Sequence, residues 1–382
     1  MPALQQPAAS LPRQAFLDRL RVMLTGLVIL HHTAIMHGAD GGWFLRFPTD
    51  DKGARVLLTM MCAVDQAFFM GLFFLLAGHF TPSALQRKGA VGFLKDRLLR
   101  LGLPLLAFGL LLGPFTASLA GMAAPGHAGL SQVLAQTWAR LLAGEVNLGP
   151  LWFAYALLLF SVAYVLLRPW LARIGARLAG VRPGHGGLVA LVLAWGAGAF
   201  LLRQWVPTGQ EVGRLQLGFF ASYALLFVVG TWSAPGRWLE QVDGPLARPW
   251  AWLSLASVPT LLIYAVLAGA LQGQPFNVRG GFSWPVLFYA FWEPLVAVGI
   301  ILMLLWRLRV SASPWPVWDR LAPSAYAAFV VHAPVVVAMG LWLQPLAWGP
   351  LAKFAVSGTL GVVLSFALGW ALRRLPGVGR VL

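Results

Sequence analysis

The chain has 382 residues, of which 59% are hydrophobic and only 10% are charged. Soluble domains average about 25% charged residues, so this composition excludes an ordinary soluble protein and indicates a polytopic membrane protein. The net charge is +16, but the basic residues lie at the ends of apolar stretches, so we expect no nucleic-acid partner. A single cysteine, Cys62, excludes an intramolecular disulfide and a cysteine-based metal site, and we expect no metal.

Apolar stretches of about 20 residues are typical of membrane-spanning helices. Ten such stretches follow one another, which predicts an all-α integral membrane protein with a single transmembrane domain over residues 1–382. An even number of spans places both termini on one side of the membrane. We expect the spans near residues 16–37, 56–80, 101–123, 149–167, 187–206, 215–234, 250–271, 284–306, 321–343 and 350–372.

Lysine and arginine are unevenly distributed between the two sides of this arrangement. The N-terminal segment around Arg13, the loops that follow spans 2, 4, 6 and 8, and the C-terminal end contain most of them. Cytoplasmic loops of membrane proteins carry such an excess. We therefore expect both termini in the cytoplasm.

The first span is apolar yet contains several ionisable residues, which are costly in a bilayer and are functional candidates by default. Arg21 and His32 are eleven residues apart, which places them on one face of a helix. Their separation along the helix axis is roughly 16 Å. Asp18 lies one turn before Arg21 and could pair with it. The structural alternative is a snorkelling arginine and a histidine that only packs between helices.

The loops on either side of the second span add two expectations. Loop 38–55, expected outside, contains Trp43 and three aspartates and would form a lip for a polar substrate. Loop 81–100, expected in the cytoplasm, is basic, and Thr81 before Pro82 resembles a helix start. We expect a helix there that lies on the inner membrane surface.

His32 is the strongest single candidate for catalysis, because a neutral imidazole can take a proton from a hydroxyl near neutral pH. Asp65, at a similar depth in the second span, or Glu293, in the eighth span, could orient it. The competing interpretations are a structural hydrogen bond for Asp65 and ion coupling for Glu293. We interpret His332, in the ninth span, as a packing or cavity-lining residue rather than a second base.

Arg97 and Arg100 form an R-x-x-R pattern at the entry of the third span, close to Arg87 and Lys88. Arginine side chains bind phosphates with two parallel hydrogen bonds, and the acyl donor acyl-CoA carries several phosphates. The alternative is plain anchoring at the cytoplasmic surface. The chain has no P-loop and no dinucleotide fingerprint, so any phosphate binding depends on these cations.

Four stretches together resemble the acyltransferase-3 family of membrane acyltransferases. Within it, the chain looks most like the glucan biosynthesis protein C branch, which comprises succinyltransferases for periplasmic glucans. The stretches are FLDRLRVMLTGLVILHH from Phe16, DQAFFMGLFFLLAGHFTPSALQRKGAVGFLKDRLLRLGLPLL from Asp65, GPLWFAYALLLF at 149–160 and SAYAAFVVHAPVVV at 324–337.

The resemblance implies ten core spans, an acyl-CoA donor used from the cytoplasm and a glycan acceptor modified on the outer side. It also implies His32 as the essential histidine, with Arg21, Arg97 and Arg100 on the donor side. Where the family often has Ser-Gly-Tyr or Ser-Gly-Phe, this chain has Ala-Gly-His, which ends at His79.

We therefore expect a multi-pass O-acyltransferase of the bacterial inner membrane, surrounded by membrane lipid. It would move an acetyl or succinyl group from acetyl-CoA or succinyl-CoA to a hydroxyl of an extracytoplasmic glucan or another polysaccharide. His32 would act as general base or as a covalent acyl relay, and the sequence does not choose between these roles. It also leaves open the acyl group, the acceptor and the oligomeric state.

The alternative function is a transporter or exporter of a glycan or lipid-linked sugar. Intramembrane histidine, aspartate and glutamate also serve proton coupling in transporters.

Overall fold

The computed structural model describes residues 15–124, 129–178, 180–182, 184–272, 274, 276–311 and 316–382. Arg13, which we assigned to the basic N-terminal segment, lies outside the described residues. In the described part of the chain the regular elements are helices, apart from one isolated bridge between Val212 and Leu215.

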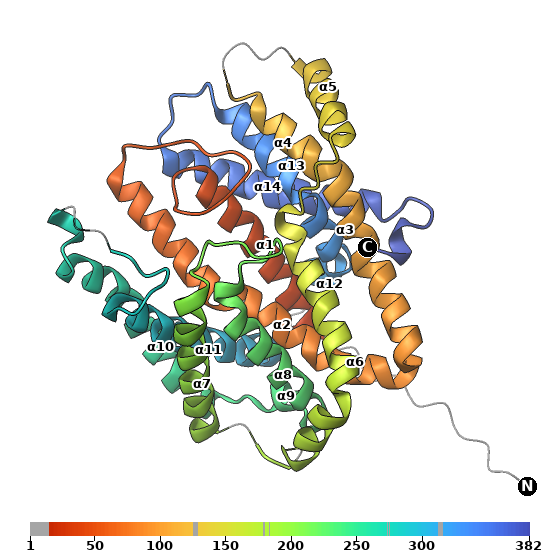
Figure 1. The fold of residues 1–382 in the computed structure, drawn as a ribbon, viewed down its shortest axis with the longest axis vertical. Coiled ribbons are helices and arrows are strands. Elements are labelled where there is room, and N and C mark those ends of the chain that lie inside the picture. Colours follow the sequence, from red (N-terminus) through yellow and green to blue (C-terminus); the bar gives the residue numbers. More distant parts are fainter. Residues whose placement is uncertain are drawn as a thin grey trace, which may run out of the picture.

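The helices form one bundle of long, tilted rods (Figure 1). Short 3-10 segments and two π-helical turns connect or interrupt them. The α-helices are α1 (Ala15–Met36), α2 (Lys52–Arg97), α3 (Leu103–Ala107), α4 (Gly113–Gly121), α5 (Gly129–Leu142), α6 (Trp152–Leu178), α7 (His185–Trp205), α8 (Phe220–Gly236), α9 (Trp238–Gln241), α10 (Gly244–Leu267), α11 (Trp284–Val310), α12 (Pro316–Leu321), α13 (Ala325–Leu343) and α14 (Pro350–Leu372).

Among the described residues, eight helical segments are long and apolar enough to cross a membrane, which indicates a multi-pass membrane protein. Helices also cover each of the ten predicted spans. The eight helical segments are fewer than the ten predicted spans, because predicted spans 2 and 3 lie in one continuous helical stretch, Lys52–Gly121. In addition, α1, which covers predicted span 1, is not among the eight segments, because its arginines and histidines make it less apolar than they are. The count of ten spans and the cytoplasmic termini remain predictions.

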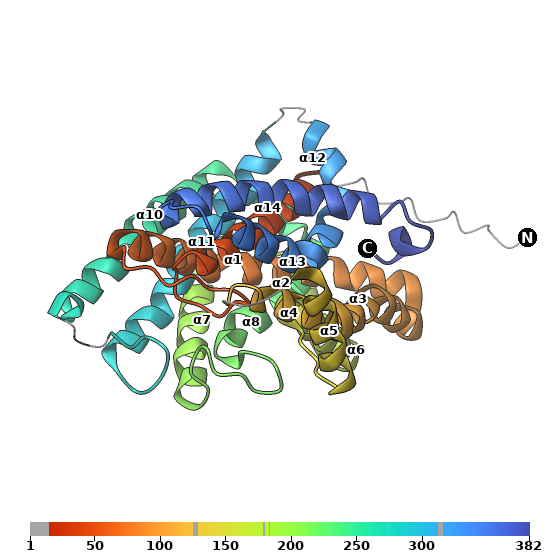
Figure 2. The same cartoon turned by 90° about the horizontal axis from the view of Figure 1, so that it is seen from above.

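Helix α1 lies in the middle of the bundle in both views (Figures 1 and 2). It packs against α2, α11, α13 and α14. Protein rather than lipid therefore surrounds most of its side chains. This position explains how an apolar bundle accommodates the ionisable residues of α1, because ionisable groups inside a membrane need protein partners or water.

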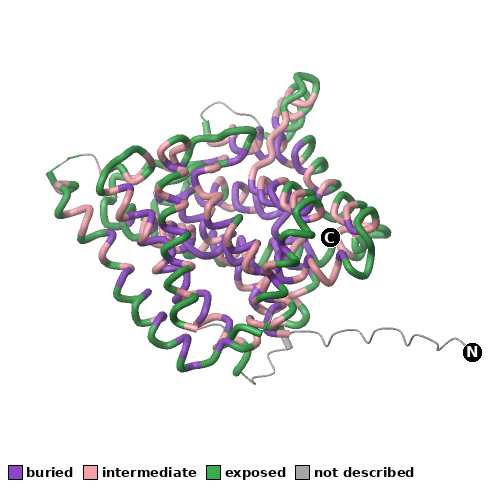
Figure 3. The backbone as a smooth tube through the Cα atoms, turned by 60° about the horizontal axis from the view of Figure 1, so that its bottom comes forward, coloured by how far each residue is buried: buried purple, intermediate pink, exposed green. Residues whose placement is uncertain are grey.

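Burial follows the same pattern over the whole bundle. Buried residues lie along the inner faces of the helices and exposed residues along their outer faces (Figure 3). Many of the exposed side chains are large and apolar, such as Leu166 on α6 and Leu267 on α10. Such an outer surface suits contact with lipid.

Helices α2 and α8 cross at two glycines, Gly78 and Gly230. A Cβ atom on Gly78 would clash with the backbone oxygen of Phe227, and one on Gly230 would clash with that of Leu75. Small residues allow helices in membranes to approach this closely. The predicted second and sixth spans are thereby held together along their length.

The helix start that we expected at Thr81 is wrong. Helix α2 continues through Pro82, and the Thr81 hydroxyl donates a hydrogen bond of 2.7 Å to the Ala77 carbonyl, one turn back. The interruption comes instead at Gly89, which has φ 66° and ψ 172°. Glycine adopts this left-handed region without a steric penalty. A π-helical turn, Leu98–Gly102, then follows directly after α2.

Candidate active site

Two histidines from opposite ends of the chain meet in the centre of the bundle. Nδ1 of His32 on α1 lies 2.9 Å from Nε2 of His332 on α13. The two rings are almost parallel, with 11° between their planes. His332 is fully buried, whereas His32 is half-buried. We interpret His332 as a packing or cavity-lining residue rather than a second base, and the structure adds that it is the hydrogen-bond partner of His32.

Trp43 covers both imidazoles. Its ring centroid lies 4.0 Å from that of His32 and 5.7 Å from that of His332, and all three rings are nearly parallel. Trp43 belongs to the predicted lip between α1 and α2. Its Nε1 atom is buried and has no hydrogen-bond partner among the described residues. The lip thus places an aromatic ring, and an N–H group without a partner among the described residues, beside His32 and His332.

Asp65 does not contact His32. Its Oδ2 atom lies 3.7 Å from Nδ1 of His31, and both side chains are buried. Consecutive residues of a helix project about 100° apart, so the carboxylate on α2 meets the face of α1 that carries His31. The expectation that Asp65 orients His32 is therefore corrected. The His31 ring stands edge-on to His32, with 5.7 Å between centroids.

Glu293 does not contact His32 either. Its Oε2 atom lies 2.5 Å from Nη2 of Arg203 on α7, and the two side chains are only 4% and 1% exposed. Arg203 also donates from Nε to the Gly218 carbonyl at 3.2 Å. A buried carboxylate requires such a partner. Sequence reasoning gave Arg203 no role, although an arginine within an apolar span is a signal for a buried pair.

At the start of α1, Arg21 pairs with Asp18 as predicted, with 3.0 Å between Nη1 and Oδ1. The Arg21 guanidinium lies 4.7 Å from the centre of the Phe80 ring. Arg97 is close enough for its charge to interact with that of Arg21. Its Nε atom is buried and has no hydrogen-bond partner in the described part of the chain. Arg21 and Arg97 therefore belong to one basic region, the Arg21–Arg97 region, and Arg100 lies within range of the same charges.

Arg100 follows Arg97 across the start of the π-helical turn at Leu98 and is the more exposed of the two. Arg100 is 58% exposed and its Nε lies 3.4 Å from Oδ1 of Asp96. Lys88 Nζ lies 2.7 Å from the same oxygen, and Arg87 is exposed. The four predicted donor-binding cations thus divide into Arg97, which turns inward, and three that face outward.

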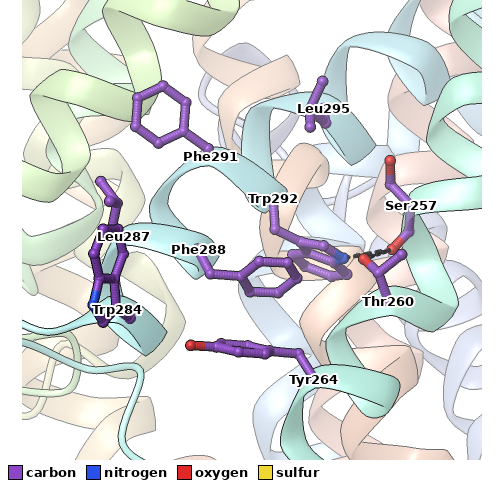
Figure 4. A pocket seen from close by; sticks show the side chains of 9 residues that line it. All are labelled: Ser257, Thr260, Tyr264, Trp284, Leu287, Phe288, Phe291, Trp292 and Leu295. Carbon is purple, nitrogen blue, oxygen red and sulfur yellow. Dashed lines mark hydrogen bonds between the residues drawn. The ribbon is translucent and has the colours of Figure 1, made fainter. Parts of the chain in front are cut away.

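A groove of about 430 Å³ lies between α10 and α11 (Figure 4). Its walls are mostly aromatic and apolar, and the Trp292 indole donates a hydrogen bond of 2.8 Å to the Ser257 carbonyl. None of the predicted site residues lines it. The lining residues are Ser257, Thr260, Tyr264, Trp284, Leu287, Phe288, Phe291, Trp292 and Leu295.

Comparison with known protein families decides the class of the chain. The family model described as an acyltransferase domain, that of the acyltransferase-3 family, matches residues 14–372. The chain belongs to the acyltransferase-3 family. The histidine pair and the Arg21–Arg97 region both lie within the matched residues, so this is a membrane acyltransferase. No curated protein and no solved structure matches the chain.

Proposed function

We propose that this acyltransferase-3 protein moves an acetyl or succinyl group from cytoplasmic acyl-CoA to a hydroxyl of an extracytoplasmic glycan, in the bacterial inner membrane. One observation carries the proposal. Helix α1, at the centre of the bundle, holds the cation Arg21 near its beginning and His32 near its end. The separation of roughly 16 Å along the helix is comparable to the length of a pantetheine arm.

The cations at the start of α1 suit the phosphates of CoA. Arg97 has a buried Nε without a partner among the described residues, and a phosphate oxygen would satisfy it. Arg21 would add a second guanidinium, and a phosphate between the two side chains would offset the repulsion of their like charges. Arg100, Arg87 and Lys88 would meet the phosphates that remain in solvent. Charge-assisted hydrogen bonds of this kind are about twice as strong as neutral ones.

His32 would supply the acid–base chemistry. Its imidazole would take the proton of the acceptor hydroxyl while the oxygen attacks the thioester carbon. The tetrahedral intermediate would then collapse, break the carbon–sulfur bond and release the CoA thiolate, which takes the proton from His32. In the alternative route the acyl group passes first to His32 and then to the glycan. Both routes require a lone pair on His32 that faces the substrates.

The acceptor would arrive at the Trp43 end of the bundle, which we expect to face outside. A periplasmic glucan fits the resemblance to the glucan biosynthesis protein C branch. An aromatic ring that is only partly buried, as in Trp43, is suited to contact with a sugar. Membership of an acyltransferase family favours this function over the glycan exporter that the sequence also allowed.

The proposal is tested by thermal unfolding of the purified protein with CoA, acetyl-CoA and succinyl-CoA, because a ligand stabilises the state that binds it. We expect each compound to raise the Tm of the wild type and of Arg177→Ala, a control at an exposed arginine on α6. We expect no increase in Arg97→Ala. A wild type that unfolds at the same temperature with all three compounds would contradict the proposal.

A further inference from the structure

We infer that His332 is the positioning residue of His32: by accepting a hydrogen bond at Nδ1 of His32, it leaves the lone pair of His32 on Nε2, where the acceptor hydroxyl can use it. The inference rests on the proposed role of His32 as the base. It assigns to α13 a function that neither the sequence patterns nor the family match assigns.

His332 makes a hydrogen bond to the backbone of its own helix. Its Nδ1 atom lies 2.6 Å from the backbone oxygen of Phe329, one turn earlier on α13. A carbonyl oxygen can only accept a hydrogen bond, so Nδ1 of His332 must carry the proton. In a neutral imidazole the other nitrogen then has the lone pair. Nε2 of His332 is therefore an acceptor.

The acceptor nitrogen of His332 fixes the position of the proton on the His32 ring. Nε2 of His332 accepts, so Nδ1 of His32, 2.9 Å away, must donate. The neutral His32 ring then carries its lone pair on Nε2. The two rings are nearly parallel, and their centroids lie 5.1 Å apart whereas the two nitrogens lie 2.9 Å apart, so the nitrogens point toward each other along the line between the rings. One backbone carbonyl thus determines the tautomer of the proposed base.

No carboxylate among the described residues pairs with either ring, which favours the neutral form of both imidazoles. The two acidic residues that we expected to orient His32 are engaged elsewhere, Asp65 by His31 and Glu293 by Arg203. An uncompensated charge is costly at this depth in a membrane protein. In the serine-protease triad a carboxylate holds the catalytic histidine in the correct tautomer. Here a second neutral imidazole does so.

The surroundings of His332 limit it to this indirect role. Its exposed fraction is 0%, and both ring nitrogens are occupied, so no substrate atom can reach it. Trp43 stacks over His32 and His332 together, which keeps the two rings nearly parallel. His332 acts on the reaction only through the orientation and tautomer of His32.

The test compares His332→Gln with His332→Asn. The glutamine carbonyl reaches the position of Nε2 and can accept from His32, whereas the asparagine side chain reaches only the position of Nδ1. His37→Asn is the matched control, because His37 lies directly after the end of α1, is buried and makes a hydrogen bond of 2.9 Å to another helix, at Ser357. Acyl transfer from acetyl-CoA and succinyl-CoA to β-glucan oligosaccharides is followed by release of the CoA thiol.

We expect His332→Asn to lower kcat by about 100-fold or more, within the usual contribution of a general base, with KM for the acyl-CoA unchanged. The glutamine variant should recover kcat to within about tenfold of the wild type, and His37→Asn should match the wild type. Equal kcat values for the glutamine and asparagine variants would overturn the inference. An equal loss in His37→Asn would also overturn it.

A second measurement does not depend on activity. In 15N-histidine-labelled protein, nitrogen chemical shifts distinguish the two tautomers, and loss of a signal in His32→Asn assigns His32. We expect the Nδ1–H form in the wild type and in His332→Gln. An Nε2–H form in the wild type would overturn the inference. An Nδ1–H form in a wild type without transfer would support the histidine pair and contradict the proposed function instead.

Discussion

The ionisable side chains of α1 each have a partner, and the partners come from very different distances along the chain. Asp18 and Arg21 pair within one turn. His32 bonds to His332, and His37 bonds to Ser357 on α14. In an apolar bundle each such contact replaces the water that the group would otherwise need. What distinguishes His32 is that it is only half-buried, whereas His37 and His332 are buried.

His32→Ala should abolish acyl transfer while the protein remains folded. The base contributes about 100- to 10,000-fold to the rate, and removal of a half-buried ring leaves the surrounding helices in contact. The rate of CoA thiol release measures acyl transfer, and the increase in Tm that CoA causes shows whether the variant is folded. Normal transfer by this variant would refute the assignment of His32, and loss of the CoA effect would show that the variant is misfolded.

Arg203 and Glu293 should contribute to stability more than to chemistry. Removal of one partner of a buried ion pair leaves an uncompensated charge and costs about 3–5 kcal/mol. Arg203→Leu should therefore unfold at a clearly lower temperature, and the double variant Arg203→Leu/Glu293→Leu should recover part of the loss. Thermal unfolding of the single and double variants measures this coupling. A single variant as stable as the wild type would count against a structural pair.

At the scale of elements, the course of α2 determines where the basic residues between Thr81 and Arg100 lie. The helix passes through Pro82 and bends at Gly89, and the π-helical turn Leu98–Gly102 follows. Arg97 is partly buried there, whereas Arg100 is exposed and its Nε lies 3.4 Å from Oδ1 of Asp96. The two arginines of the R-x-x-R pattern therefore differ in their exposure to solvent.

The crossing of α2 and α8 should tolerate no larger residue. Gly78→Val places side-chain atoms against the backbone of α8, and overpacking of this kind costs about 1–3 kcal/mol. We expect a lower Tm and a smaller yield of monodisperse protein. Gly187→Val on α7 is the control, because a Cβ atom there meets nothing within 4 Å. An equal Tm and an equal yield for Gly78→Val and Gly187→Val would contradict the close contact between α2 and α8.

For the whole molecule, the proposed reaction requires that the Arg21 end faces the cytoplasm and the Trp43 end faces outside. Both ends have exposed residues suited to labelling: Arg87 in the basic loop and Asp50 in the lip. Cys62 is buried and can be replaced without a new charge. The proposed direction of transfer therefore depends on a topology that labelling can establish independently of activity.

In a Cys62→Ala background, Asp50→Cys should react with a membrane-impermeant maleimide on intact cells. Arg87→Cys should react only after the cells are permeabilised, because the excess of basic residues places that loop in the cytoplasm. Gel-shift detection of the labelled protein measures both. The reverse pattern would invert the topology and exclude cytoplasmic acyl-CoA as the donor of this reaction.

The sequence by itself determined the features that depend on local geometry. Hydropathy was sufficient to predict the helices, and residue spacing was sufficient to predict the Asp18–Arg21 pair and the shared face of Arg21 and His32. The motifs around Arg21, His32 and Arg97 were sufficient for the family. These features follow from the rise and twist of one helix or from short stretches of chain, so neighbouring residues specify them.

Only the tertiary structure decided which residues meet across helices. It paired His32 with His332 rather than with Asp65 or Glu293, and it placed Trp43 over both rings. Such contacts depend on how far each helix is rotated and shifted against its neighbours. Hydropathy cannot specify this, because an apolar helix surrounded by protein is apolar on every side. The orientation of the proposed base is thus a property of the packed bundle.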